Sequence, residues 1–373
     1  MKRLSLIFLL LSLISVSQAQ YTLHLLVTTP NTPDTIYLAG NINSWDPAAG
    51  AYRLTSDGNG KKTLIIKSLP PGNYQFKFTR GSWNKVETNT KGEDIPNREI
   101  DLHRDTTLAL TIDAWKDQFA AAPKHHTASA QVRILDTAFF IPQLHRYRRI
   151  WVYLPGSYHT GKNKHYPVLY MQDGQNLFDE QTASFGEWGI DECLDTLQQT
   201  TGRDCIIIGI DHGGDHRITE YDPYDNAQYG TGEGDAYAKF LVATLKPFID
   251  SSYRTLKDPQ HTYIAGSSLG ALIALYAVMK YPRTFGAAGI FSPAFWIAPP
   301  LNNQLQHTQW NTPHRFYCYA GEKESARMTS DMDTVIDILK KYNEVFRSVN
   351  PRGQHSEKYW RQAFPAFYTW LVR

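Results

Sequence analysis

The alternation of apolar and polar residues changes character along the 373-residue chain. Between residues 21 and 113, short apolar runs are separated by Gly, Pro, Asn and Asp, and no helical period of useful length is present. This pattern predicts a small all-β sandwich domain over residues 20–113, with a linker at 114–130. The strand-like runs are Tyr21–Thr28, Thr35–Ala39, Lys62–Ile66, Tyr74–Thr79 and Thr106–Ile112.

From about Gln131 onward, apolar strand-like runs alternate with segments whose apolar residues recur at helical spacing. Such alternation predicts a mostly parallel sheet flanked by helices, so residues 131–373 are expected to form an α/β domain. The predicted strands are Arg149–Leu154, Pro167–Met171, Cys205–Ile210, Tyr263–Ala265, Ala287–Phe291 and Phe316–Tyr319. The predicted helices are Ala236–Ile249, Leu269–Lys280, Met332–Tyr342 and Tyr359–Leu371.

The first nineteen residues have the pattern of a signal peptide. Lys2 and Arg3 form a positive head, and Leu4–Val16 is an almost unbroken apolar run that is too short to span a bilayer comfortably. Ser17 and Ala19 provide small residues where a signal peptidase reads the chain. Residues 1–19 are therefore predicted to be removed, which makes the protein exported, either periplasmic or secreted.

Composition adds two exclusions. The net charge is +2 and no long run of Lys or Arg occurs, so no nucleic-acid or membrane partner is expected. The three cysteines are too few, and odd in number, for a disulfide framework.

The sharpest chemical signal is the run Gly266-Ser267-Ser268-Leu269-Gly270, which lies between a predicted strand and a predicted helix. Glycines on either side of a serine allow the tight strand-to-helix turn on which α/β-hydrolases present their nucleophile. The helix N-terminus then places backbone N–H groups beside the serine. Ser268 is therefore the predicted nucleophile, and the N–H of Leu269 is predicted to form half of an oxyanion hole.

The α/β-hydrolase fold supplies its catalytic groups in the chain order serine, acid, histidine, each after a strand. His355 follows a plausible last strand and precedes the final helix, so it is the predicted general base. The predicted acid is Glu324, which follows the strand Phe316–Ala320, and three alternatives stay open: Glu322, Asp331 and Asp333. The acid would orient the imidazole and stabilise its positive charge.

A second oxyanion donor is expected from the loop after the strand Pro167–Met171. Gly174 allows close backbone approach there, so the N–H of Gln175 is the candidate. The run Asp211–His216 contains ligand types that suit zinc. Because hydrolysis on this fold needs no metal, we expect neither a metal site nor a cofactor.

Residues 131–373 resemble the esterase D family of α/β-hydrolases, which includes feruloyl and acetyl esterases of carbohydrate esterase family one, siderophore esterases and mycolyltransferases. The matching stretches are Tyr170–Phe178, Glu187–Glu192, Arg217–Pro223, Gly266–Gly270, Phe291–Trp296 and Gly353–His355. The resemblance implies that four residues line or support the substrate pocket: Trp188, Glu220, Tyr221 and Trp296.

The first domain resembles starch-binding modules of family twenty and the related glycogen-binding modules. The resemblance rests on Ala39–Pro47, Tyr74–Phe78 and Pro96–Glu99. Trp45 and Lys77 match two residues of the family's glucan platform, whereas Trp83 lies earlier than the family's second tryptophan. The resemblance predicts a β-sandwich, and either a glucan-binding or a purely structural role for it.

Together these features predict an exported serine carboxylic-ester hydrolase that acts through an acyl-serine intermediate. Export and a sugar-binding-like domain favour feruloyl or acetyl esters on plant polysaccharides, so the substrate would be a small ester or an esterified polysaccharide. A siderophore trilactone esterase is the first alternative, and an acyltransferase is the next. A non-catalytic polysaccharide-binding protein is the alternative from another functional class.

Overall fold

The computed structural model describes residues 19–43, 45–58, 61–119, 124–226, 229–310, 312–325 and 327–373. The predicted signal peptide, up to residue 18, lies outside these residues. The chain divides into two compact units, Met1–Ala122 and Pro123–Arg373. No helix in the described ranges has the length and apolar character needed to cross a membrane.

The first unit is built from short strands around one apolar core. The sheets have the strand orders β3-β4-β1-β8, β2-β5-β7 and β6-β9, and β1 and β8 run parallel. Leu25, Phe78 and Leu102 are completely or almost completely buried between the strands. The strands are β1 (Tyr21–Thr28), β2 (Tyr37–Gly40), β3 (Thr55–Ser56), β4 (Lys62–Leu69), β5 (Gly72–Thr79), β6 (Glu87–Thr88), β7 (Arg98–Leu102), β8 (Thr106–Thr111) and β9 (Ala114–Trp115).

The predicted linker 114–130 is too long at both ends. Ala114 and Trp115 form β9, which pairs with β6, and the Trp115 side chain is fully buried in the core of the first unit. At the other end, the Ser129 N–H donates a hydrogen bond to Asp191 Oδ2 (2.6 Å) in the second unit. A two-residue strand is too short to give a periodic signal, which explains why the pattern of residues did not reveal it.

The second unit contains one eight-stranded sheet with the order β10-β11-β13-β12-β14-β15-β16-β17. The first two pairings are antiparallel and the other five are parallel, which confirms the predicted α/β-hydrolase fold. The strands are β10 (Val132–Ile141), β11 (Arg146–Tyr153), β12 (Val168–Gln172), β13 (Ile206–Ile210), β14 (Thr262–Ser267), β15 (Ala287–Phe291), β16 (Arg315–Gly321) and β17 (Glu344–Asn350).

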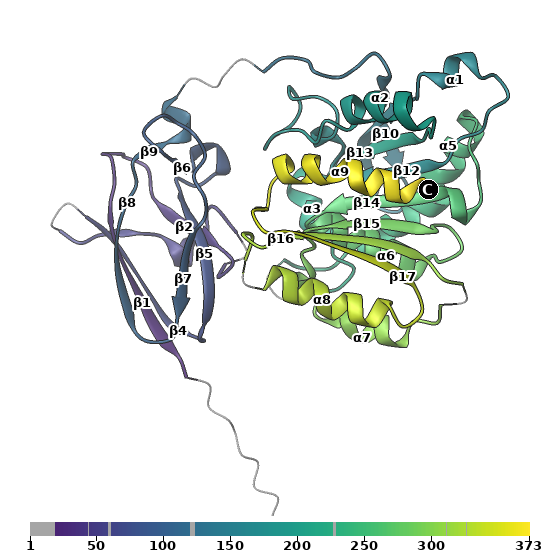
Figure 1. Ribbon diagram of the computed structural model, residues 1–373. Coiled ribbons are helices and arrows are strands. Elements are labelled where there is room, and N and C mark those ends of the chain that lie inside the picture. Colours follow the sequence, from purple (N-terminus) through teal and green to yellow (C-terminus); the bar gives the residue numbers. More distant parts are fainter. Residues whose placement is uncertain are drawn as a thin grey trace, which may run out of the picture. The chain divides into compact units, whose positions relative to one another are not determined.

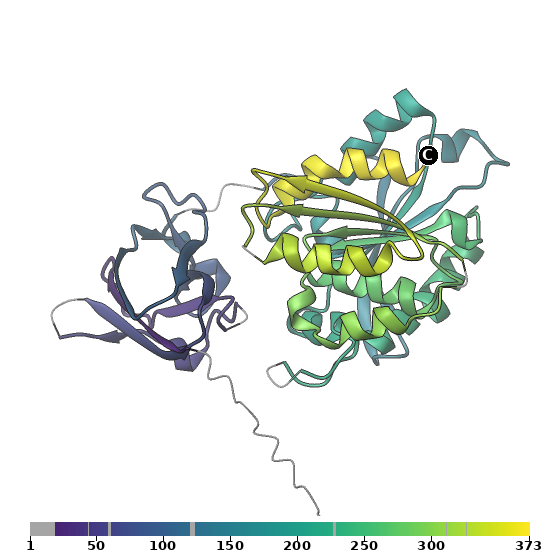
Figure 2. The same cartoon turned by 60° about the horizontal axis from the view of Figure 1, so that its bottom comes forward.

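Helices cover both faces of this sheet, as Figures 1 and 2 show. Helices α2 and α9 lie on one face and α6, α7 and α8 on the other. Alternate residues of each strand point into two separate apolar cores, as Leu169 and Tyr170 of β12 illustrate. The helices are α1 (Ser157–Thr160), α2 (Ile190–Thr201), α3 (Arg217–Tyr221), α4 (Gly234–Phe240), α5 (Lys246–Ser252), α6 (Leu269–Lys280), α7 (Pro300–His307), α8 (Met328–Leu339) and α9 (Glu357–Leu371).

The three cysteines, Cys193, Cys205 and Cys318, are free thiols in this fold. Cys205 and Cys318 are buried in the cores, where they act as small apolar side chains. The parallel strands β12, β14, β15, β16 and β17 all end at the same edge of the sheet, and ligand sites of open α/β sheets lie at that edge.

Candidate active site

Ser268 lies on the turn between β14 and α6, at the carboxyl edge of the sheet. Its backbone adopts φ 56° and ψ −120°, a conformation that a residue with a side chain rarely takes. Two hydrogen bonds to residues beyond α6 anchor it: the Ser268 N–H donates to Phe291 O (2.9 Å), and the Ala294 N–H donates to Ser268 O (3.1 Å). The residue is half-buried, so its hydroxyl is presented on a strained and anchored turn.

The two glycines of this turn are required by close packing. A Cβ atom on Gly266 would lie 2.6 Å from the carbonyl carbon of Gly270, because strand and helix approach each other there. A Cβ atom on Gly270 would lie 3.0 Å from Gln172 Cβ and 3.1 Å from Asp173 Oδ2. Small residues therefore bring the start of α6 against the loop that follows β12.

Glu324 and His355 form a hydrogen-bonded pair at the same edge. His355 Nδ1 lies 2.8 Å from Glu324 Oε2, and the Glu324 side chain is only 1% exposed. An ionised carboxylate only accepts hydrogen bonds, so Nδ1 carries the proton and Nε2 is free to accept one. The His355 side chain is 36% exposed, which leaves its far side accessible to a substrate.

The three alternative acids are placed elsewhere. Glu322 is exposed to solvent, Asp331 lies 3.6 Å from Arg327, and Asp333 forms an ion pair with Arg347 (2.6 Å). Among the four candidates, Glu324 is the carboxylate that faces His355.

A close backbone contact keeps the acid and the histidine together. A Cβ atom on Gly321 would lie 2.3 Å from the carbonyl carbon of Gly353, and the Lys323 N–H donates to Gly353 O (2.9 Å). Among the described residues, no hydrogen bond joins the Ser268 hydroxyl to His355. Hydrogen bonds of this kind often tighten only when substrate is bound.

The predicted oxyanion donors lie on the two backbone segments that meet beside Ser268. Leu269 is the first residue of α6, and Gln175 belongs to the 3₁₀ turn Gly174–Asn176 after β12. A Cβ atom on Gly174 would lie 2.8 Å from Ile210 N, so only glycine allows this turn to approach β13. Within the described ranges, neither the Leu269 nor the Gln175 N–H donates to another group.

Two further carboxyl groups lie close to these elements. Asp173 accepts two hydrogen bonds from Arg217, at 2.7 and 2.9 Å. Glu357, two residues after His355, is 7% exposed and accepts a hydrogen bond from Asn176 Nδ2 at 3.4 Å. Burial raises the pKa of the Glu357 carboxyl to about 7, and the charge of Asp173 contributes to this rise.

Three of the four residues expected to line or support the pocket are buried. Trp188 (2% exposed) packs against the rings of Phe291 and Trp360 in the core, and Tyr221 is fully buried. Glu220 is also fully buried, and its carboxylate accepts hydrogen bonds from two arginines, of which Arg148 is the nearer (2.6 and 2.7 Å). These three side chains contact other buried protein groups, so they do not line an open pocket.

The fourth predicted pocket residue, Trp296, is 41% exposed. It lies on the 3₁₀ turn Phe295–Ile297, two residues beyond the Ala294 N–H that binds Ser268 O. A second exposed aromatic residue, Phe185 (61%), lies on the loop that Ser184 N–H ties to Asn176 Oδ1 (3.2 Å). Exposed aromatic rings therefore occur on loops bonded to the nucleophile turn and to the oxyanion loop.

In the first unit, the structure brings Trp45 next to Trp83. Their ring centroids are 6.2 Å apart with an angle of 40° between the planes, and both residues are half-buried. Lys77 lies on β5 with a pKa lowered mainly by burial. The sequence spacing placed Trp83 outside the family pattern, but the fold places its ring beside Trp45.

In the run Asp211–His216, the Asp211 carboxylate is hydrogen-bonded to other side chains of the protein. Asp211 accepts hydrogen bonds from Arg149 Nε and Trp151 Nε1, both at 2.8 Å. In the part of the chain that the structure describes, no three His, Cys, Asp or Glu side chains form a cluster suited to a metal ion.

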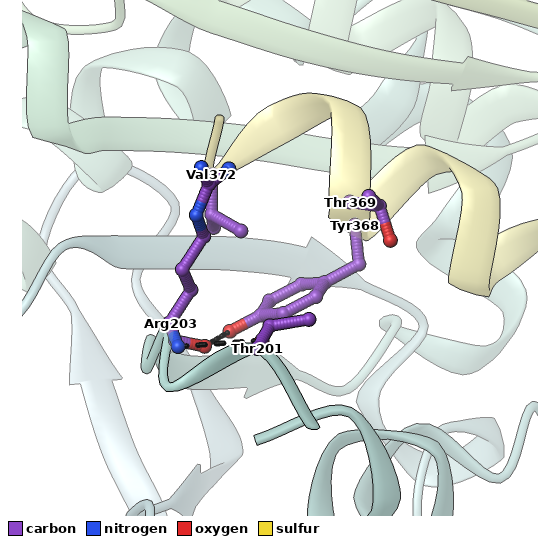
Figure 3. Close-up of a pocket in the computed structure, with 5 residues that line it drawn as sticks. All are labelled: Thr201, Arg203, Tyr368, Thr369 and Val372. Atoms are coloured by element: carbon purple, nitrogen blue, oxygen red, sulfur yellow. Dashed lines mark hydrogen bonds between the residues drawn. The ribbon is translucent and has the colours of Figure 1, made fainter. Parts of the chain in front are cut away.

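A surface pocket of about 300 Å³ lies apart from this site, between the ends of α2 and α9 (Figure 3). It is lined by Thr201, Arg203, Tyr368, Thr369 and Val372. Two of these residues are hydrogen-bonded to each other, because the Tyr368 hydroxyl donates to Arg203 O (2.9 Å). Because both helices end there, the pocket lies toward the amino edge of the parallel strands, away from Ser268.

The fold and the site define a serine hydrolase of the α/β-hydrolase class. A family model described as "Putative esterase" matches residues 141–371, and the chain belongs to this esterase family. The ferric enterobactin esterase of Salmonella typhimurium has the same fold, with a TM-score of 0.53 at 15% identity, covering 91% of this chain and 89% of its own. The BES protein of Bacillus cereus also has a TM-score of 0.53, at 17% identity over 68% of this chain and all of its own.

Three relatives are similar in sequence. The uncharacterized protein YbbA of Bacillus subtilis (strain 168) is 27% identical over 213 residues, which are 55% of this chain and 79% of that protein. An endo-1,4-beta-xylanase/feruloyl esterase of Xylanibacter ruminicola is 27% identical over 262 residues, 69% of this chain and 30% of that enzyme. An alpha-amylase of Niallia circulans is 42% identical over 93 residues, 24% of this chain and 7% of that enzyme.

Sequence reasoning missed three polar residues at the site: Ser292, Trp360 and Glu357. Ser292 belongs to a stretch that matched the family, but its side chain had no assigned role. Trp360 and Glu357 are on the first turns of α9, where nothing in the sequence distinguishes them from other helix residues.

The raised pKa of Glu357 predicts a pH-dependent stability. Between the ordinary pKa of glutamate and about 7, the unfolded chain releases this proton while the folded chain keeps it, so stability falls as the pH rises. Glu357→Gln removes this loss. We expect the variant to match the wild type near pH 4 and to be more stable by about 1–3 kcal/mol near pH 8, as measured by urea unfolding.

Glu322→Gln is the matched control, because it neutralises an exposed carboxylate near the same edge of the sheet. Its stability should follow that of the wild type at both pH values. A Glu357→Gln variant whose difference from the wild type is the same at both pH values would show that this carboxyl has the same pKa in the folded and the unfolded chain.

Proposed function

We propose that the protein is an exported serine carboxylesterase that acts through an acyl-enzyme on Ser268. The observation that carries this proposal is the Glu324–His355 pair (2.8 Å) at the same sheet edge as the strained Ser268 turn. Acid, histidine and serine occur in the chain order that this fold uses. Lys2, Arg3 and the apolar run Leu4–Val16 support export.

In the proposed mechanism, His355 Nε2 takes the Ser268 proton while Oγ attacks the ester carbonyl carbon. The Leu269 and Gln175 N–H groups donate to the oxyanion that forms, and Glu324 stabilises the imidazolium. The C–O bond to the alcohol then breaks, and His355 returns the proton to the leaving oxygen. Water attacks the acyl-serine by the same steps, which releases the acid and restores Ser268.

For the substrate, we propose feruloyl or acetyl esters on plant polysaccharides. The similarity to an endo-1,4-beta-xylanase/feruloyl esterase and the exposed rings of Trp296 and Phe185 support this class, since flat rings stack on a flat acyl group. The fold shared with a ferric enterobactin esterase supports a catecholate trilactone as the alternative substrate. A hydroxyl acceptor in place of water would make the same site an acyltransferase.

Ser268→Ala tests the proposed mechanism. The purified mature chain is expected to hydrolyse p-nitrophenyl acetate and methyl ferulate, or a catecholate trilactone, and to react with a fluorophosphonate probe. Loss of the Ser268 hydroxyl should abolish labelling and lower kcat/KM by about 10³-fold or more, because no other group can form the acyl-enzyme. The substrate with the highest kcat/KM identifies the acyl group.

The neighbouring Ser267 provides the matched control, since it is buried at the end of β14 and lies next to the nucleophile in the chain. Ser267→Ala should keep both labelling and turnover. An unlabelled, inactive wild-type chain with an intact fold would favour the non-catalytic polysaccharide-binding protein.

Trp296→Ala tests the acyl-group assignment. Removal of the exposed ring should lower kcat/KM for methyl ferulate by about 3- to 10-fold relative to p-nitrophenyl acetate. Tyr342→Ala is the control, because Tyr342 is 58% exposed and lies just before β17, at the amino edge of the sheet. An equal loss on both substrates would show that Trp296 does not contact the acyl group.

A second proposed function concerns the first unit, which we infer binds an α-glucan. The supporting observations are the adjacent rings of Trp45 and Trp83 and the 42% identity of a 93-residue segment to an alpha-amylase. Both indoles are half-buried and therefore partly accessible, and sugar rings stack on accessible indole faces. Lys77 is the polar residue that the family resemblance adds to this platform.

Pull-down of the full chain on insoluble starch tests this function. Trp45→Ala and Trp83→Ala should each weaken binding by about 3- to 10-fold, because each removes one stacking surface. Ile65→Ala, which truncates an exposed apolar side chain on β4, should bind like the wild type. Equal retention of all four proteins on starch would assign a structural role to the pair of tryptophans.

A further inference from the structure

Behind the Glu324–His355 pair lies a chain of buried hydrogen bonds. Trp360 Nε1 donates to Ser292 Oγ (2.8 Å), and Ser292 Oγ donates to Glu324 Oε1 (2.7 Å). Ser292 is fully buried, and Trp360 and Glu324 are each 4% exposed. These side chains come from three separate parts of the chain, so the fold assembles the connection at one place.

The direction of each hydrogen bond in this chain is fixed by its chemistry. The indole N–H can only donate, so Ser292 Oγ must accept from Trp360. The single hydroxyl proton of Ser292 is then left for the carboxylate. Glu324 Oε1 also accepts the Gly321 N–H (2.5 Å), so two donors occupy this oxygen and Oε2 is left to His355.

Backbone contacts hold both positioning groups in place. Ser292 follows β15 with φ 46°, and its N–H donates to Tyr319 O (2.7 Å), which turns its side chain toward the end of β16. The Trp360 ring lies edge-on to the His355 ring, with centroids 5.0 Å apart and an angle of 85° between the planes. Trp360 therefore contacts the imidazole directly and the carboxylate through Ser292.

We propose that Ser292 and Trp360 are positioning residues for the acid of the esterase reaction, and that they fix the plane of the Glu324 carboxylate so that Oε2 faces His355. This inference rests on the proposed serine esterase function. Neither residue touches the substrate; both act through Glu324, and Trp360 also packs against His355.

The proposal has a consequence for the pH dependence of the reaction. Loss of the Ser292 hydroxyl leaves the Glu324 carboxylate free to turn, so Oε2 no longer faces His355 and the imidazolium is stabilised less. Because the general base must be neutral, the acid limb of the kcat/KM profile should move to lower pH. The neighbouring ionisable groups are common to wild type and variant: Glu357, whose pKa the charge of His355 affects, Asp173 and Arg217, whose charges act on Glu357, and Tyr319, on which the charge of Glu324 acts.

Three variants test the proposal in the full mature chain. Ser292→Ala should lower kcat/KM by about 10- to 100-fold, since it removes a hydrogen bond to a charged group, and should move the acid limb to lower pH. Trp360→Phe should cost less, about 3-fold, because Ser292 still has its proton to donate. Ser292→Ala also leaves the Trp360 N–H buried without a partner, so it should unfold at lower urea concentration.

The double variant Ser292→Ala/Trp360→Phe separates a positioning role from a structural one. It removes the orphaned N–H, so its stability should recover relative to Ser292→Ala, while its kcat/KM should stay at the level of Ser292→Ala. Activity that recovers together with stability would overturn the proposal. An acid limb at the wild-type position in Ser292→Ala would overturn it as well.

Trp370→Phe is the matched control. Trp370 lies on the same helix and in the same apolar core, is 7% exposed, and its buried Nε1 has no hydrogen-bond partner among the described residues. Trp370→Phe should keep the wild-type pH profile of kcat/KM. Equal losses of kcat/KM in Trp370→Phe and Trp360→Phe would show that the effect comes from ring packing alone. Fluorophosphonate labelling of the wild type keeps the two proposals distinct, because only its absence contradicts the esterase function itself.

Discussion

The backbone of Ser268 has the φ and ψ of a strained residue, and much of the second unit is arranged to keep it so. A conformation of this kind costs about 1–3 kcal/mol and persists only when the surroundings impose it. Hydrogen bonds with Phe291 and Ala294 anchor the Ser268 peptide on both sides. Gly266 and Gly270 remove the side chains that would push β14 and α6 apart. The strained turn therefore depends on β15 and on the loop after β12, which are followed by Ser292 and carry the proposed oxyanion donor Gln175, respectively.

Asp173, Glu324 and Glu357 are carboxyl groups near this edge of the sheet, and their hydrogen-bond partners give each a different character. Asp173 faces Arg217 with two parallel hydrogen bonds, so its charge is compensated. Glu324 has backbone and hydroxyl donors on one oxygen and His355 on the other. Glu357 has a single long hydrogen bond from a side chain and is buried, which raises its pKa. The local donors, and not the residue type, decide which carboxylate can serve an imidazole.

The residues that the sequence located best are those tied to chain order. Ser268, Glu324 and His355 each follow a strand, and parallel strands end at one edge, so their positions along the chain imply that they meet. The α/β-hydrolase fold followed from the same alternation and is confirmed. The catalytic roles of the three residues stay predictions.

The other features of the site depend on three-dimensional contacts that the spacing of residues along the sequence does not reveal. Trp188 and Tyr221 belong to matching family stretches but are buried, since an aromatic residue in a sequence looks the same in a core as in a pocket. Ser292 and Trp360 are 68 residues apart and meet only because β15 ends beside the start of α9. Likewise, Trp83 lies beside Trp45 in the fold, although its position in the sequence differs from that of the family's second tryptophan.

Residues that precede the segment matched by the family model also contact the loops of the site. The match begins at residue 141, yet Thr127 Oγ1 donates to Glu187 (2.6 Å) and accepts the Glu180 N–H (2.8 Å). Farther along the same loop, Thr182 Oγ1 donates to Gln175 O (2.7 Å), next to the proposed oxyanion donor. Thr127, a residue of the predicted linker, therefore hydrogen-bonds to the loop that contains Glu180 and Thr182. That loop in turn hydrogen-bonds to Gln175. The geometry of the oxyanion loop therefore depends on residues that precede the segment matched by the family model.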